Sequence, residues 1–344
     1  MMISSRRPRV NQEAFCFICK HIIKYLAGVY IKAYSARAIL SRGKDMYRMI
    51  SGGEPDRMIF PGRGFNKKLL VRPDGAEIMT KGKTGGMPLL MIPGLGGDSE
   101  CWGGMFPRKL REGGIDPAVY DPRGLGQSSS GSREPSISLY AADAAAVLED
   151  RAPGGAVLGW SMGASVAIGL ALYRPDLVTR LILCCGTGDH GMLVRRNPEV
   201  FRPILDREAP VAELASVLGS MLLPLDQRGN TSFSRAFLSV IRDSFVRHEE
   251  GIRSQQKALA ACPPAMSRLH EISVPVLVIM GDRDLLIPPR EGENLVRDLP
   301  DARLEILSGG HGLIYERPAE LAERVCSFLS LPGKDSWSPC PAGG

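Results

Sequence analysis

The chain has 344 residues, 44% of them hydrophobic, and it carries a formal net charge of +6 at pH 7. This length and hydrophobic content suffice for one large domain or two ordinary ones, so we expect a soluble globular protein with a sizeable core. Much of the positive charge lies in residues 1–44, where nine Lys or Arg accompany a single acidic residue, Glu13. Nucleic-acid binding is therefore disfavoured, because affinity for phosphate needs basic side chains gathered on one surface.

Cysteine usage and hydropathy indicate the compartment. The cysteines lack the spacing of a disulfide framework and lie at Cys16, Cys19, Cys101, Cys184, Cys185, Cys262, Cys326 and Cys340. That pattern is typical of a reducing compartment, and we expect a cytoplasmic protein. Cys16 and Cys19 have CxxC spacing, but no second Cys or His pair lies at a zinc-like distance, so no metal or other cofactor is predicted. No run reaches the roughly 18 uninterrupted apolar residues of a transmembrane helix.

Residues 1–65 form a basic N-terminal extension that leaves three interpretations open. The segment 15–34 is apolar but is interrupted by Lys20, Lys24 and Lys32, which fall on one side of a helix. Such an amphipathic helix could make peripheral contact with an anionic membrane. The interpretation we favour is an ordinary helix packed on the core or over a pocket mouth. An organelle-targeting segment is the third, since the chain opens with arginines and serines and almost no acid.

From about Asn66 onward, short apolar runs alternate with helical patterns, which is the signature of βαβ units and a parallel sheet. A hairpin over 69–80 comes first, turning at 72–75. Strands are then expected at 88–92, 118–120, 156–159, 178–184, 274–280 and 303–307, and helices at 101–112, 137–150, 162–173, 290–299 and 318–329. The predicted fold class is α/β, with a doubly wound, mostly parallel sheet.

One stretch departs from this rhythm. Residues 188–264 carry helical patterns, such as 211–221 and 233–247, but no strong strand. The simplest interpretation is a helical cap inserted over the sheet edge at which doubly wound folds bind ligands. The predicted organisation is thus one domain over 66–331 that includes this cap, followed by a flexible Pro/Gly/Ser-rich tail over 332–344.

The run Gly159-Trp160-Ser161-Met162-Gly163 is the first motif that carries chemistry. A Gly-x-Ser-x-Gly match is weak by itself, but this one lies between a short apolar strand and a helix of small residues. That is the strand-turn-helix setting of a nucleophile elbow. The alternative is a glycine-lined helix start with a capping serine. We predict that Ser161 is a nucleophile.

A serine needs a base to accept its proton, and the base needs a carboxylate to fix its tautomer. His311 lies in a glycine-flanked loop after the last predicted strand and can reach over the sheet edge. Asp284 ends the preceding strand, and we prefer it to Asp282 as the acid. The order Ser161, Asp284, His311 is the Ser, Asp/Glu, His order of the nucleophile-elbow enzymes.

The negative charge that develops on the substrate oxygen needs preorganised N–H donors. We expect them to be the backbone amides of Met162, next to the nucleophile, and of Leu95 in the glycine-rich loop 93–97. A phosphate cradle is the weaker interpretation of that loop, because no Lys-Ser/Thr pair follows it. The residues expected to line the substrate pocket are Gly94, Trp102, Trp160 and His190.

With these motifs in place, the chain resembles the α/β-hydrolase superfamily over about 66–331. The resemblance rests on Pro93-Gly94-Leu95-Gly96-Gly97, Asp121-Pro122-Arg123-Gly124-Leu125-Gly126-Gln127-Ser128, the Ser161 motif, and the Asp284/His311 pair. The most similar members are small single-cap serine hydrolases such as enol-lactonases, haloperoxidase-like esterases and methylesterases. The resemblance implies a nucleophile at Ser161, a base at His311 and an acid at Asp284, with no cofactor.

The predicted function is cofactor-independent hydrolysis of a carboxylic ester, lactone or thioester of a small molecule through an acyl-enzyme. Two alternatives stay open because function resides in the pocket and not in the fold. One is use of the same triad for carbon–carbon hydrolysis, acyl transfer, or a lyase or cyclase step of a natural-product pathway. The other is a ligand receptor without catalysis.

Overall fold

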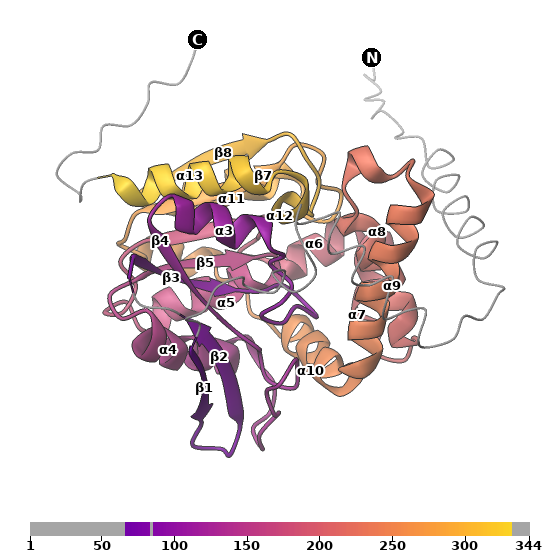
Figure 1. Ribbon diagram of the computed structural model, residues 1–344, viewed down its shortest axis with the longest axis horizontal. Coiled ribbons are helices and arrows are strands. Elements are labelled where there is room, and N and C mark those ends of the chain that lie inside the picture. The colour runs from indigo at the N-terminus through magenta and orange to yellow at the C-terminus, as the bar shows by residue number, and fades with distance from the viewer. Residues whose placement is uncertain (1–65, 83–84, 332–344) are drawn as a thin grey trace, which may run out of the picture. The chain divides into compact units, whose positions relative to one another are not determined.

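The structure is a computed structural model, and it describes residues 66–82 and 85–331 (Figure 1). The predicted extension over 1–65, with its amphipathic helix and CxxC pair, lies outside the described residues, as does the tail predicted at 332–344. In the described part of the chain, no helix is long and apolar enough to cross a membrane.

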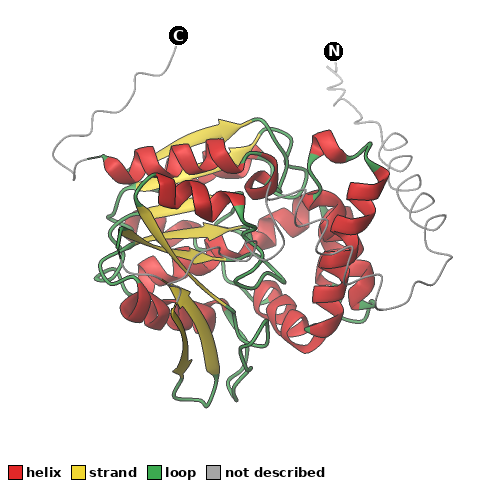
Figure 2. Ribbon diagram, in the orientation of Figure 1, coloured by secondary structure: helices red, strands yellow, loops and turns green. Residues whose placement is uncertain are grey.

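The described residues form an eight-stranded sheet, yellow in Figure 2, in the order β1-β2-β4-β3-β5-β6-β7-β8. The strands are β1 (Asn66–Val71), β2 (Glu77–Gly82), β3 (Met87–Ile92), β4 (Ile115–Tyr120), β5 (Ala156–Trp160), β6 (Leu181–Cys184), β7 (Val276–Gly281) and β8 (Ala302–Leu307). β1 and β2 form the expected hairpin, β2 joins β4 antiparallel, and all other pairs are parallel. The predicted α/β class with a mostly parallel sheet is confirmed.

Helices cover both faces of this sheet (Figure 1). They are α3 (Met105–Glu112), α4 (Ile137–Arg151), α5 (Met162–Tyr173), α11 (Pro289–Asp298), α12 (Leu313–Glu316) and α13 (Pro318–Ser330). Successive side chains of a strand point to opposite faces. On β3, Leu89 and Met91 join the apolar cluster that contains α3 and α13, while Leu90 and Ile92 join the one that contains α4, α5 and α11. The sheet therefore lies between two apolar layers, which explains the continuous apolar runs of its inner strands.

The strand order reverses at β3. The chain passes from β3 to β4 on one side and then returns to β5 on the other side of β3. Ile92, the last residue of β3, pairs with Gly159 near the end of β5. The loops that follow these two strands therefore leave the sheet side by side, at the kind of switch point where doubly wound folds bind ligands.

Between β6 and β7 the chain is helical, and we call α6 to α10 the cap. Its elements are α6 (His190–Arg196), α7 (Pro198–Leu205), α8 (Val211–Leu222), the 3₁₀ turn Leu225–Gln227, α9 (Thr231–Arg247) and α10 (Glu249–Ala260). A second 3₁₀ segment, Met266–Glu271, leads back to the sheet. The cap has a small apolar cluster of its own, formed by Leu223, Phe233 and Phe237.

The expected elements agree with the structure in kind, and the differences lie at their ends. The helix expected from residue 101 begins at Met105, because the preceding residues form tight turns. Asp98 accepts hydrogen bonds from the amides of Glu100 and Cys101, and Gly103 has a φ of +64°. The strand expected from residue 178 begins at Leu181.

Candidate active site

Ser161 occupies the turn between β5 and α5 in a strained backbone conformation. Its φ of 57° and ψ of −122° lie where residues with a side chain are rarely found. The Ser161 N–H donates to the Cys184 carbonyl at 2.9 Å, and the Ser161 carbonyl accepts from the Ala164 N–H at 2.9 Å. These two bonds hold the turn from both sides. The serine hydroxyl does not cap the helix that follows, so the capping interpretation of this serine is wrong.

Two glycines of the motif make this turn sterically accessible. A Cβ on Gly159 would lie 2.3 Å from the Gly163 carbonyl oxygen, and a Cβ on Gly163 would lie 2.2 Å from the carbonyl oxygen of Ile92. Both distances are far inside van der Waals contact, so any side chain would push α5 away from β3 and β5. The sequence pattern therefore reflects close backbone approach on both sides of Ser161.

His311 and Asp284 meet Ser161 at the same sheet edge. His311 Nε2 is 2.8 Å from Ser161 Oγ, and His311 Nδ1 is 2.7 Å from Asp284 Oδ2. The His311 and Asp284 side chains are only 2% and 0% exposed. The second carboxylate oxygen of Asp284 accepts the N–H groups of Leu286 and Ile287. A carboxylate at Nδ1 favours the tautomer that leaves Nε2 free to accept the serine proton.

The competing acid, Asp282, lies elsewhere. It is exposed, and its carboxylate accepts the Gly309 N–H at 2.9 Å and contacts Arg283. The structure thus brings Asp284 to the histidine and uses Asp282 to shape the loop before His311.

The loop after β3 passes directly over Ser161. A Cβ on Gly94 would lie 3.1 Å from Ser161 Cβ, and the Gly97 N–H donates to the Gly94 carbonyl at 3.0 Å, which closes a tight turn. Gly96, at the third position of that turn, has a φ of +75°, as a type II turn requires. The amides of Leu95 and Met162, predicted as oxyanion donors, have no acceptor among the described residues. Both lie next to Ser161, Leu95 through this turn and Met162 through the chain.

The cap contacts this loop at Gly96. The Gly96 N–H donates to Oε1 of Gln255 at 2.7 Å, and Gln255 is a buried residue of α10. A Cβ on Gly96 would lie 2.3 Å from the Phe245 ring of α9 and 3.0 Å from Ile252 of α10. The peptide that follows Leu95 is therefore held by the cap. Sequence reasoning missed Gln255, because a glutamine within an amphipathic helix carries no signal of its partner.

A cavity of about 390 Å³ opens beside the loop. Its apolar wall comes from Leu95, Trp160, Leu222, Phe237, Val240, Ile241, Phe245 and Tyr315. Its polar lining residues are Lys81, Asp98, Ser99, Glu100, Asp121, Gln127, Ser244, Arg247 and His248. A volume of this size suits a small organic molecule.

Of the four predicted pocket residues, Trp160 lines this cavity and the other three do not. Gly94 packs on Ser161 instead. Trp102 is fully buried, with its ring centre 6.2 Å from that of Trp160, so it supports the wall from behind. The Trp160 indole N–H donates to the His311 carbonyl at 3.2 Å, which links the cavity wall to the base.

His190 is buried at the start of the cap. Its Nε2 lies 2.7 Å from the Ser165 hydroxyl, and that hydroxyl donates to the Thr187 carbonyl at 3.3 Å. The ring therefore donates to the serine, opposite to the direction that a base requires. No described residue partners its Nδ1, and burial lowers the pKa of His190 to about 4. This second Ser–His pair is structural, joining α6 to the nucleophile helix α5.

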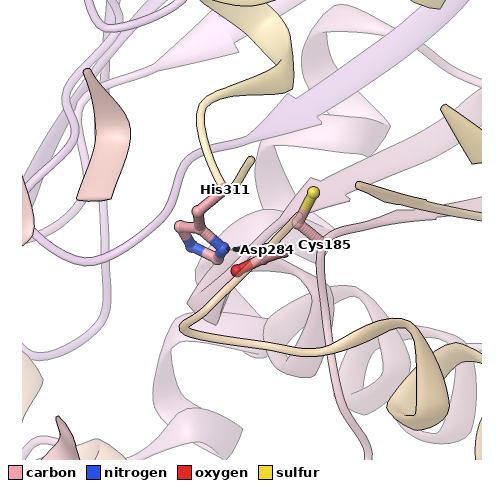
Figure 3. A group of neighbouring side chains, drawn as sticks. All are labelled: Cys185, Asp284 and His311. Carbon is pink, nitrogen blue, oxygen red and sulfur yellow. Dashed lines mark hydrogen bonds and ion pairs between the residues drawn. The ribbon is translucent and has the colours of Figure 1, made fainter. Parts of the chain in front are cut away.

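Cys185, which follows β6, was also missed from sequence. Figure 3 shows its thiol beside Asp284 and His311, and the ligand atoms of all three lie within 4.8 Å of one another. This is the one group among the described residues with metal-like spacing. It fits a metal poorly, because His311 Nδ1 is engaged by Asp284. A hydrogen bond with Cys184, together with complete burial, also raises the pKa of the Cys185 thiol, whereas metal binding needs the thiolate.

The chain is similar to several known proteins and solved structures. The chain is similar to the uncharacterized hydrolase YugF of Bacillus subtilis, with 26% identity over 50% of the chain and 64% of that protein. The chain is also similar to pyrrolizixenacetamide deacetylase of Xenorhabdus hominickii, 26% identical over 71% of the chain and 91% of that protein. Among solved structures, the enol-lactonase from Burkholderia xenovorans LB400 superposes with a TM-score of 0.65 at 23% identity, over 77% of the chain and 100% of that structure.

The likeness to the enol-lactonase structure concerns the fold alone. The match to YugF spans less than two thirds of that relative's length. The family assignment rests on a broader match over residues 89–324, which runs from within β3 to within α13 and includes the whole cap. The chain belongs to the alpha/beta hydrolase family.

Proposed function

We propose that the protein is a serine hydrolase that cleaves a carboxylic ester, lactone or thioester of a small molecule through an acyl-enzyme. The observation that carries this proposal is the pair of contacts at His311, 2.8 Å to Ser161 Oγ and 2.7 Å to Asp284 Oδ2. A nucleophile in reach of a base, and a base oriented by a buried carboxylate, are the arrangement that nucleophilic acyl transfer needs.

The proposed first step is attack of Ser161 Oγ on the substrate carbonyl carbon while His311 Nε2 takes the hydroxyl proton. The resulting oxyanion lies against the amides of Leu95 and Met162. When the bond to the leaving group breaks, His311 returns the proton to that group. Asp284 stabilises the imidazolium in between without itself taking the proton.

The second step releases the acyl group. Water gives a proton to His311 Nε2 and attacks the acyl carbon, and the Ser161 oxygen leaves and recovers the proton. The products are the acid and the leaving alcohol or thiol. All charge that develops lies on the substrate oxygen and the imidazole, so the chain's own groups suffice for both steps.

Rapid-mixing kinetics with p-nitrophenyl acetate test this proposal. We expect a burst of p-nitrophenol equal to the enzyme concentration, and an acetyl group on Ser161 in protein quenched during turnover. Hydrolysis without an acetylated serine, or unchanged turnover in Ser161→Ala, would contradict the mechanism.

Product analysis distinguishes the other uses of the same triad. If the acyl group is recovered on added alcohols or amines in excess over water, the protein is an acyl transferase. If the protein does not hydrolyse esters but cleaves a carbon–carbon bond adjacent to a ketone, the proposed cleavage of an ester, lactone or thioester bond is wrong. Binding of acyl compounds without any turnover would identify a ligand receptor.

A further inference from the structure

The cavity beside Leu95 has one acidic group, Asp98, that forms no ion pair with any described residue. We propose that this cavity is a substrate subsite that binds a protonated amine against Asp98, with the apolar body of the same molecule along the cap wall. The inference rests on the proposed function, because the subsite would serve the Ser161 centre.

Asp98 is the group that points to a cation. One of its carboxylate oxygens accepts the Glu100 N–H at 2.9 Å, and Asp98 forms no ion pair with any described residue. Burial and the nearby charge of Asp121 raise the pKa of Asp98, and the Glu100 N–H and the charges of His248 and Lys81 offset part of that rise. A partly buried carboxylate without an ion-pair partner is a candidate site for a cationic ligand. Ser99, next in the chain, also lines the cavity, and its fully buried hydroxyl has no described partner.

The other anionic groups of the cavity are already engaged. Both oxygens of Asp121 accept backbone N–H groups, from Ser99 at 2.9 Å and from Gln127 at 2.8 Å. Glu100 is paired with Lys81. Asp98 is therefore the carboxylate with capacity for a ligand.

None of the cationic groups that line the cavity forms an ion pair with Asp98, although the charges of Lys81 and His248 act on its carboxylate from a longer distance. The Lys81 ammonium is engaged by Glu100. Arg247 is an exposed residue whose Nε donates to the Asp243 carbonyl at 3.1 Å. The His248 ring is hydrogen-bonded to the Ser244 carbonyl at 2.9 Å, so it turns one nitrogen toward its own helix.

The apolar lining residues suit an aromatic or alkyl body. Phe237 and Tyr315 meet edge to face with ring centres 5.5 Å apart, and Tyr315 meets Trp160 in the same way at 6.0 Å. Trp160 directly precedes the nucleophile, and Leu95, which carries a proposed oxyanion donor, also lines the cavity. A carbonyl placed at that donor would therefore extend one substituent into the cavity, with its apolar part first and its polar end toward Asp98.

Three matched ligands test the subsite without requiring turnover. Dissociation constants of 4-phenylbutylamine, 4-phenylbutan-1-ol and 4-phenylbutanoate would be measured by calorimetry on Ser161→Ala protein at neutral pH. The three share one apolar body and differ in the charge of the end group. We expect the amine to bind about tenfold more tightly than the alcohol, because its hydrogen bond to Asp98 is charge-assisted, and the carboxylate to bind most weakly.

Asp98→Asn should bring the amine to the level of the alcohol and leave the alcohol within about twofold. Asp226→Asn is the matched control, since Asp226 is an exposed cap residue outside the cavity lining, and it should preserve the preference.

The proposal fails if the alcohol or the carboxylate binds as tightly as the amine, if no ligand binds, or if the preference survives in Asp98→Asn. The order of the three ligands with Asp98 intact decides the matter even if that variant does not fold. An intact amine preference without any esterase activity would overturn the proposed function and leave the subsite standing.

Discussion

Replacing Gln255 by leucine should slow catalysis and leave substrate binding nearly unchanged. Gln255 Oε1 accepts the Gly96 N–H at 2.7 Å, and both groups are buried. Leucine has a similar volume but no acceptor, so the amide would be left unsatisfied at a cost of about 1–3 kcal/mol. The turn can recover part of that cost by rotating the peptide between Leu95 and Gly96, which displaces the neighbouring Leu95 amide from the oxyanion position.

The expected loss of kcat follows from the rate enhancement that one oxyanion-hole donor provides. Outright loss of one such donor lowers kcat by roughly 10²–10³-fold. Because Leu95 would be displaced and not removed, we expect kcat to fall about tenfold to hundredfold, with KM changed by less than about threefold. Steady-state kinetics with p-nitrophenyl acetate would measure both constants, and thermal unfolding would measure stability.

The adjacent residue provides the control. Gln256 is also a buried glutamine of α10, but its Nε2 donates to the carbonyls of Ile204 and Asp206 inside the cap. Gln256→Leu should therefore lose a comparable amount of stability and keep its kcat. Equal losses of kcat in the two variants, or an unchanged kcat in Gln255→Leu, would refute the link between the cap and the oxyanion loop.

Three further predictions concern the acid, a buried histidine and the elbow. Asp284→Asn should lower kcat by about 10⁴-fold with little change in stability, because the amide favours the wrong tautomer of the base; stopped assays and unfolding curves check this. The pKa of His190 is about 4, below its unfolded value, so its contribution to the free energy of unfolding is fully present above about pH 6.5 and is lost as the pH falls toward 4. His190→Gln should therefore flatten the pH dependence of stability, as measured by urea titrations between those limits. Gly163→Ala should yield little folded protein by circular dichroism, since its Cβ would lie 2.2 Å from the Ile92 carbonyl oxygen.

The alternation of apolar runs with helical patterns predicted the sheet, and the motifs predicted that three side chains meet at its edge. Both predictions were possible because these signals depend on local chemistry. The Ser161 turn needs small residues at fixed offsets, and Asp284 and His311 each follow a strand of the sheet. The carboxyl ends of parallel strands share one edge, so residues far apart in the chain could be placed together from their positions after strands alone.

Contacts of the cap could not be predicted in the same way. Gln255 and Phe245 reach Gly96 through tertiary packing of helices whose patterns only indicate an apolar face. His190 was expected to line the pocket from its position after β6, but its ring contacts Ser165. The direction of a side chain at the start of a cap depends on the packing of the whole cap, which periodicity does not encode.

Labelling with a fluorophosphonate probe tests the central claim most directly. Such a probe reacts with serines whose proton a neighbouring base accepts, so we expect one phosphonylated residue, Ser161, when the labelled protein is digested and mapped by mass spectrometry. His311→Ala should abolish labelling while the protein stays folded. Absence of labelling in the folded wild-type protein, or labelling at a different serine, would contradict the assignment of Ser161 as an activated nucleophile.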